Sequence, residues 1–183
     1  FNIKSASGAK VKSEIYQTIH KLGAWKGKPG KPAKNLELDK PQPGIVVTYT
    51  HRGQKKTDLV VQRLAAFHIA EKGDITQFLD HGPFDARMDG YIQAARNMPV
   101  ELFTAGSGLV TISLNGKVIC KNKDAAAQPA ILCALKKGFN KLLIEYSGPA
   151  TGDATFRLYW RSNAYFPKEP LPATSLYHEA GKD

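Results

Sequence analysis

The run from Leu109 to Cys120 holds two segments of β-branched and apolar residues separated by Asn115-Gly116. Asn and Gly tolerate the positive φ angles that a tight two-residue turn requires, so this pattern predicts a β-hairpin. The hairpin lies within the stretch from Phe84 to Trp160, around which we expect the rest of the chain to be organised. It is the feature that most constrains the fold.

Short strand-like segments with turn residues between them begin after Gly44. They recur at intervals of about 8 to 12 residues without alternating helices, which predicts an all-β fold, an antiparallel β-sandwich or barrel. A charged turn is expected between the first two strands. Besides the two hairpin strands, we expect strands at Ile45 to Thr50, Val60 to Ala70, Phe84 to Ile92, Pro99 to Phe103, Ala130 to Leu135, Asn140 to Ser147 and Ala154 to Trp160.

The N-terminal part has a different character. Apolar residues at helical spacing predict a short amphipathic helix that ends near Gly23. The segment from Trp25 to Pro43 is rich in Pro, Lys and Gly, and we expect an extended basic arm without regular structure. The predicted organisation is an extension over residues 1–43, a sandwich over residues 44–178 and a tail over residues 179–183.

The formal charge of +10 is concentrated at the N-terminal end. Residues 1–60 contain 12 Lys and Arg against 4 Asp and Glu, whereas residues 61–183 contain 14 against 12. Lysines surround a single aromatic residue, a pattern that fits a strap on an acidic partner subunit, a linker, or contact with an anionic surface or glycan. Because Arg is scarce and only one aromatic is present, nucleic acid is not expected. The docking candidates are Trp25, Lys26, Lys28, Lys31 and Lys34.

Cys120 and Cys133 lie on either side of a polar, Ala-rich connection between two expected strands. If those strands are neighbours in one sheet, a disulfide is geometrically plausible, and closing its loop of about 15 residues contributes about 3 kcal/mol in the chain-entropy model. The alternative is a pair of buried thiols in a reducing compartment.

Several segments together resemble the PA-fourteen module, the β-sandwich domain first described in a toxin protective antigen. The first half is carried by Phe84-x-x-Arg87-x-x-Gly90-Tyr91-Ile92, by a strand ending in Phe103, and by Gly108-Leu109-Val110 leading to Leu114-Asn115-Gly116-Lys117. The second half is carried by Leu135-Lys136-Lys137-Gly138-x-Asn140-Lys141-Leu142, Ile144-Glu145-Tyr146, Phe156-Arg157-Leu158-Tyr159-Trp160, Phe166-Pro167-Lys168-Glu169-Pro170-Leu171-Pro172 and Leu176-Tyr177-His178. The resemblance covers Phe84 to His178 well and Gly44 to Gly82 loosely.

The chain departs from this family at the position that matters most for function. Family members that act as calcium-dependent lectins carry two adjacent aspartates just before the glycine that opens the hairpin strand, because carboxylate oxygens suit Ca²⁺. Here the matching positions are Gly106 and Ser107. Neither residue supplies a charged ligand, so the resemblance implies no calcium site.

Catalytic and metal-binding patterns are not found in the sequence. The five histidines are scattered without metal-ligand spacing, and there is no cytochrome-type haem motif, so no metal or cofactor is expected. Ser107 lacks the setting of a nucleophile elbow. Asp85 and Asp89 could form an acid pair, but we expect Arg87 between them to neutralise both at the surface. A hydrolase with a site that cannot be recognised in one sequence is the remaining enzymatic alternative.

These observations predict a non-catalytic, exported binding or assembly module. No apolar run approaches the roughly 20 residues that a transmembrane helix needs, and a first residue Phe1 fits a processed product. Similar modules occur in exported bacterial proteins with c-type cytochrome domains, which implies an accessory subunit of a periplasmic or cell-surface complex, with electron transfer as one setting and peripheral association with a membrane complex as another. The alternative is a carbohydrate-binding module that recognises glycans without calcium.

Overall fold

The structure is a computed structural model that describes residues 38–126 and 129–181. Within these residues it contains thirteen strands, one 3-10 turn and no α-helix. The elements are β1 Pro41–Pro43, β2 Ile45–His51, β3 Lys56–Gln62, β4 Ala66–Ile69, β5 Phe84–Ala94, β6 Met98–Gly106, β7 Leu109–Leu114, β8 Lys117–Asp124, β9 Ile131–Leu135, β10 Gly138–Ser147, β11 Ala154–Ser162, β12 Phe166–Pro170, η1 Ala173–Ser175 and β13 Leu176–Glu179.

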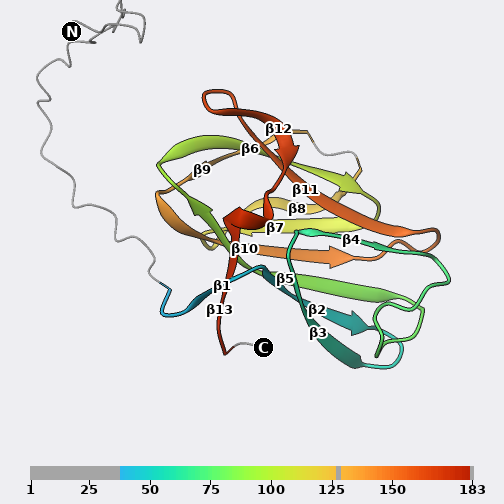
Figure 1. Cartoon of the computed structure of the whole chain (residues 1–183). Coiled ribbons are helices and arrows are strands. Elements are labelled where there is room, and N and C mark those ends of the chain that lie inside the picture. Colours follow the sequence, from blue (N-terminus) through green and yellow to red (C-terminus); the bar gives the residue numbers. More distant parts are fainter. Residues whose placement is uncertain (1–37, 127–128, 182–183) are drawn as a thin grey trace, which may run out of the picture. The chain divides into compact units, whose positions relative to one another are not determined.

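The first sheet has eight strands and is centred on the antiparallel pair β5 and β10 (Figure 1). On one side β10 pairs with β7, which pairs with β8. The other edge of β5, opposite β10, is shared by two strands. β2 pairs with the first half of β5, and β13 pairs with Tyr91 and Ile92. Gly90 lies where the two meet, and a Cβ there would be 2.8 Å from the Tyr177 carbonyl oxygen and 2.9 Å from Ile45 Cγ1. Only glycine allows both strands to approach β5 this closely.

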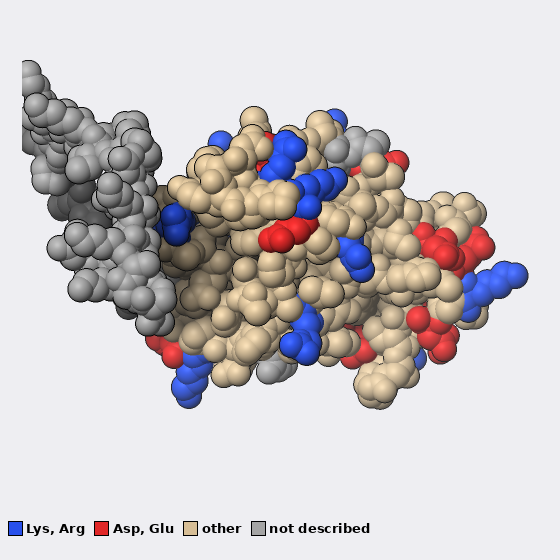
Figure 2. Space-filling view, turned by 45° about the horizontal axis from the view of Figure 1, so that its top comes forward, with Lys and Arg blue, Asp and Glu red and all other residues tan. Residues whose placement is uncertain are grey.

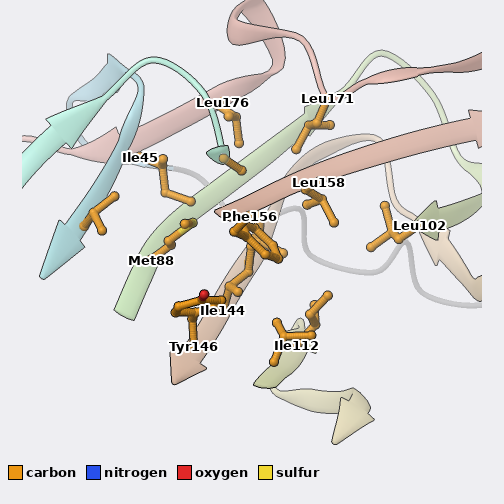
Figure 3. Close-up of a cluster of buried hydrophobic side chains, with 14 of the residues drawn as sticks. Ile45, Met88, Leu102, Ile112, Ile144, Tyr146, Phe156, Leu158, Leu171 and Leu176 are labelled. Atoms are coloured by element: carbon orange, nitrogen blue, oxygen red, sulfur yellow. The ribbon is translucent and has the colours of Figure 1, made fainter. Parts of the chain in front are cut away.

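The second sheet has five strands in the order β12, β11, β6 and β9, with β4 pairing on β11. Alternate residues of its strands face the first sheet, as in β11, where Ala154, Phe156, Leu158 and Trp160 are buried. Figure 3 shows side chains of both sheets meeting between the two layers. This arrangement confirms the predicted antiparallel β-sandwich.

A cluster of aromatic rings fills one end of the core. Tyr49, Phe67, Phe84, Tyr146 and Phe156 lie in mutual contact, and the rings of Phe67 and Tyr146 are 4.9 Å apart in an edge-to-face arrangement. The end of β2 and the start of β5 lie at this end of the sandwich. We call it the loop end, because the connections that follow β2, β4, β6 and β10 meet there (Figure 1).

The Asn-Gly hairpin is confirmed. β7 and β8 pair as antiparallel neighbours, and Asn115 and Gly116 have φ angles of 51° and 80°. The expected strand from Val60 to Ala70 is wrong, because the chain crosses between the sheets at this point: β3 pairs with β2 in the first sheet and β4 pairs with β11 in the second. Ala65, which is 2% exposed, lies in this crossing.

One segment near the N-terminus is more regular than predicted. Pro41–Pro43, expected to be part of an irregular arm, forms β1 and pairs with β13, at a sheet edge where proline is tolerated. The predicted N-terminal helix and the arm before Leu38 lie outside the described residues. In the described part of the chain, no helix is long and apolar enough to span a membrane.

Candidate binding site at the loop end

The end of β6 and the connection to β7 contain Gly106 and Ser107, where the sequence resemblance places a pair of calcium-binding aspartates. Gly106 has a φ of 142°, and a Cβ at this position would lie 2.0 Å from the Thr155 carbonyl oxygen. Ser107 Oγ donates a hydrogen bond to the Asp153 carbonyl oxygen (2.6 Å) and accepts one from Thr155 N (3.0 Å). Ser107 N also donates to Thr155 O (2.9 Å). Hydrogen bonds to the chain entering β11 therefore hold this connection in place.

Asp153 links three connections of the loop end. Its Oδ2 lies 3.1 Å from His68 Nε2, and its Oδ1 accepts a hydrogen bond from Glu71 N (3.1 Å). Glu71 Oε1 in turn accepts from Gly152 N (2.8 Å). The hydrogen bond from His68, followed by that from the Glu71 main chain, lowers the pKa of Asp153 from its ordinary value. The two carboxylates thus tie the loop after β4 to the loop before β11.

A cavity of about 460 Å³ lies between these loops. Its wall is anchored by Arg52, whose Nη2 donates to the Phe84 carbonyl oxygen (2.8 Å) and whose Nε donates to Asp85 Oδ2 (3.1 Å). Asp85 also accepts from Ser147 Oγ (2.6 Å). The cavity is lined by Arg52, Ile69, Ala70, Glu71, Gly73, Gly82, Pro83, Phe84, Gly148, Pro149, Ala150, Thr151, Gly152 and Ala154.

The lining combines flat apolar surface with hydrogen-bonding groups. Ile69, Pro83 and Pro149 offer apolar contacts, while Glu71 and Thr151 offer a carboxylate and a hydroxyl. Several of the lining residues are glycines, which bring main-chain atoms to the cavity surface. A pocket of this size and mixed character suits a small polyhydroxylated ligand.

The loop end carries charges of both signs at its surface. Glu71, Asp74, Asp80 and Asp153 are exposed in its loops, and so are Arg52, Lys55 and Lys72. Figure 2 shows acidic side chains gathered at the right, where these loops lie. The cavity lining itself carries one cation, Arg52, and one anion, Glu71, which favours a neutral ligand.

Possible metal ligands and reactive side chains lie around the cavity. Within residues 38–126 and 129–181, no three His, Cys, Asp or Glu side chains are grouped to hold a metal ion. The Ser107 hydroxyl is engaged with main-chain atoms. His51, whose Nδ1 accepts a hydrogen bond from Gln54 N (3.0 Å), stabilises the turn after β2.

The predicted neutralisation of Asp85 and Asp89 by Arg87 is correct for Asp89 only. Arg87 lies 3.7 Å from Asp89 and 3.8 Å from Glu145, and Lys141 also pairs with Asp89. Asp85 pairs instead with Arg52, which lies in the turn after β2, at 3.1 Å. Residues on neighbouring strands and turns decide which ion pairs Asp85 and Asp89 form, and the order of residues along β5 does not reveal these neighbours.

The predicted disulfide depended on its two strands being neighbours in one sheet, and the structure does not place them so. Cys120 lies on β8 in the first sheet and Cys133 on β9 in the second, and no disulfide joins them in the structure. The bridge was expected for neighbouring strands of one sheet, whereas the connection from β8 to β9 crosses between the layers. Burial raises the pKa of Cys133 to about 11 and also raises that of Cys120.

The remaining predicted site residues fall in two groups. Gly106 and Ser107 lie directly behind the loops that form the cavity. The docking candidates Trp25, Lys26, Lys28, Lys31 and Lys34 lie outside the described residues. Sequence reasoning missed Arg52, Glu71 and Asp153, because no local motif connects residues so far apart in the chain.

No family model matches the sequence, and no curated protein matches it. Its fold is similar to that of an anti-sigma factor domain-containing protein from Clostridium clariflavum (TM-score 0.65, 16% identity, covering 78% of this chain and 49% of that one). It is also similar to the PA14 domain of the antifreeze protein MpAFP (TM-score 0.59, 12% identity, covering 82% and 98%).

A third similar structure is the A domain of epithelial adhesin 9 from Candida glabrata, solved in complex with Galβ1-4GlcNAc (TM-score 0.59, 7% identity, covering 81% and 95%). The chain spans about half the length of the anti-sigma factor domain-containing proteins that it matches, 50% and 49%. All these identities are low, so the similarity establishes the fold alone. The described part of the chain has a PA14-like β-sandwich fold.

Proposed function

We propose that this chain is a non-catalytic, exported binding module whose loop-end cavity takes a neutral glycan without calcium. The observation that carries the proposal is the cavity of about 460 Å³, whose lining mixes apolar surface with hydroxyl, carboxylate and main-chain groups. Sugars present hydroxyl groups on an apolar ring, and such a lining serves both.

Hydrogen bonds within the protein hold these loops together. In the described chain, Ser107 holds the β6–β7 connection through main-chain hydrogen bonds, and Asp153 and Glu71 accept main-chain N–H groups. These contacts support a binding site whose loops are held in place without a bound metal ion. The cavity lining carries one charge of each sign, Arg52 and Glu71, which supports a neutral sugar over a uronic acid or sulfated glycan.

Similar structures lend support to this proposal. The adhesin domain was solved with a galactose-containing disaccharide, and another similar structure is described as a PA14 sugar-binding domain from an RTX adhesin. These proteins also support placement outside the cytoplasm, whether periplasmic or at the cell surface. The cytochrome-associated role in electron transfer rests on the sequence resemblance alone, and nothing in the structure adds to it.

Docking to other subunits through residues 1–43 remains part of the proposal. The lysines of this segment suit an acidic partner. Co-purification from the native source tests it: a partner retained by the whole chain and lost on removal of residues 1–37 is the expected result. An isolated monomer without partners would refute the assembly role and leave the glycan proposal standing.

A glycan array tests the sugar-binding function, followed by calorimetric titration of each hit with and without a chelator. We expect binding to a neutral glycan that the chelator leaves unchanged. Thr151→Trp places a bulky side chain at the cavity wall and should weaken binding at least tenfold. Lys137→Trp, an exposed position at the opposite end of β10, is the matched control and should bind normally. Binding that needs calcium, or that Thr151→Trp leaves intact, would refute the proposal.

A further inference from the structure

Strand β3 has one unpaired edge. It pairs with β2 in an uninterrupted register from Ile45↔Gln62 to His51↔Lys56, and within the described residues no strand pairs with its other side. β4, at the facing edge of the second sheet, likewise pairs only with β11. β3 is seen at the lower edge of the sheet in Figure 1. An unpaired edge presents main-chain donors and acceptors that can pair with a further strand.

A groove of about 680 Å³ separates these two edges. Its walls are inward-facing residues of β2 and β3 on one side, and β4 with the loop from Ile75 to Phe78 on the other. Apolar side chains are exposed around it, with 39% exposure for Leu59, 42% for Val61 and 69% for Phe78. The groove is therefore bordered by apolar surface and separate from the loop-end cavity, with which it shares Ile69 alone.

The inner wall of the groove carries acceptors. Asp58 Oδ2 and Gln62 Oε1 are buried and make no hydrogen bond with the described residues. The Gln62 amide instead donates through Nε2 to the Tyr49 hydroxyl oxygen (2.8 Å). Burial raises the pKa of Tyr49 to about 12, so this hydroxyl stays protonated. Buried acceptors of this kind favour an occupant that brings donors.

We propose that this groove binds an extended peptide segment of a partner protein, which adds as a strand to the edge of β3 and places a Lys or Arg side chain opposite Asp58. Successive side chains of an added strand alternate between the groove and the outer face. One set therefore meets Asp58 and Gln62, and the other set extends the apolar row of Leu59 and Val61. Main-chain pairing supplies affinity, and the alternating side chains supply specificity.

Asp58 also decides which strands are rejected. An inward-facing charge on an edge strand opposes pairing with a purely apolar strand, because the carboxylate would be desolvated without a partner. A cation on the incoming strand removes this penalty. Selectivity then has two sources: the cost of desolvating Asp58 rejects apolar strands, and its attraction to a Lys or Arg favours basic ones.

A displayed library of random nonapeptides, selected on the whole chain, tests the inference. We expect enriched sequences without proline in which one Lys or Arg is flanked by apolar residues. A synthetic enriched peptide should bind at least tenfold more weakly to Asp58→Asn and equally well to Glu145→Gln, an acidic residue on the outer face of the same sheet. In an added strand, every second peptide N–H points toward β3 and the others point away from it. Methylation of the N–H groups that point toward β3 should abolish binding, and methylation of the others should not affect it.

Chemical-shift mapping with the same peptide locates its site. Perturbations should centre on residues 56–62 and leave residues 148–154 unaffected. Failure to enrich any sequence, binding that is indifferent to Asp58→Asn, or perturbations at the loop end would each overturn the inference. A glycan that binds in the groove in place of peptides would overturn it as well, without bearing on the loop-end cavity.

Discussion

Asn115 Nδ2 donates a hydrogen bond to Asn140 Oδ1 across 3.0 Å. Asn115 forms the hairpin turn, and its own Oδ1 accepts from Lys141 N (2.9 Å). Asn140 is fully buried, and its Nδ2 donates to the carbonyl oxygens of Lys136 (2.7 Å) and Ile92 (3.3 Å). The side chain that forms the turn thus also joins the hairpin to the central strand of the sheet.

Removing these contacts should destabilise the domain. Asn140→Ala leaves several main-chain groups without partners, and we expect a loss of about 2–4 kcal/mol in the free energy of unfolding. Asn115→Gly keeps the positive φ but removes two hydrogen bonds, and should cost about 1–2 kcal/mol. Asn122→Gly is the control. Asn122 also has a positive φ, 45°, and its main-chain N donates a hydrogen bond to Thr111 Oγ1 that the substitution keeps. Denaturant unfolding measures all three, and equal losses at positions 115 and 122 would contradict the role of the Asn115 side chain.

Glycine at position 106 should be far less replaceable than glycine at position 152. Both have positive φ, 142° and 81°, but a Cβ at Gly106 would lie 2.0 Å from Thr155 O, whereas a Cβ at Gly152 would meet nothing within 4 Å. Gly152→Ala carries only the backbone cost, roughly 1–2 kcal/mol. Gly106→Ala adds steric overlap, and we expect about 3 kcal/mol or more in total.

The same overlap predicts that calcium binding cannot be restored simply. Gly106→Asp with Ser107→Asp should lower the melting temperature, and added calcium should not raise it. Thermal unfolding with and without calcium measures both effects. A calcium-dependent recovery of stability would show that the connection can rearrange around a metal ion.

Asp153 should contribute to acid stability. Its pKa is lowered in the folded state by the hydrogen bonds from His68 and the Glu71 main chain, so its contribution is present above the unfolded-state pKa and is lost as the pH falls through the folded value. The loss therefore occurs below about pH 4. Asp153→Asn should flatten the pH dependence of unfolding in this range. Carboxyl chemical shifts followed during acid titration give the direction independently.

Both cysteines should be found as thiols that react slowly. Since burial raises the pKa of Cys133 to about 11 and raises that of Cys120, little reactive thiolate is present at neutral pH. Alkylation of native protein should be slow and should accelerate as the pH rises. Alkylation after denaturation without reductant should add two groups, as read by mass spectrometry. An unchanged mass would instead mean that the cysteines are bridged.

Local chemistry let the sequence by itself determine the fold class, the hairpin and most strands. The turn at Asn115-Gly116 depends on the φ preferences of two adjacent residues, and the strands of the core depend on composition and spacing within a few residues. The absence of aspartates at Gly106 and Ser107 was likewise visible in the sequence. Each of these features is decided by neighbours along the chain.

Only the tertiary structure decided the site and the partners of individual side chains. His68 and Glu71 reach Asp153 across 85 and 82 residues, and Arg52 reaches Asp85 across 33. The single expected strand from Val60 to Ala70 became two strands in different sheets, which separated the edges that form the groove beside Asp58. Cys120 and Cys133, close in the sequence, ended in opposite layers. Pairing between strands depends on how the whole core closes, and the order of residues does not record which edges will meet.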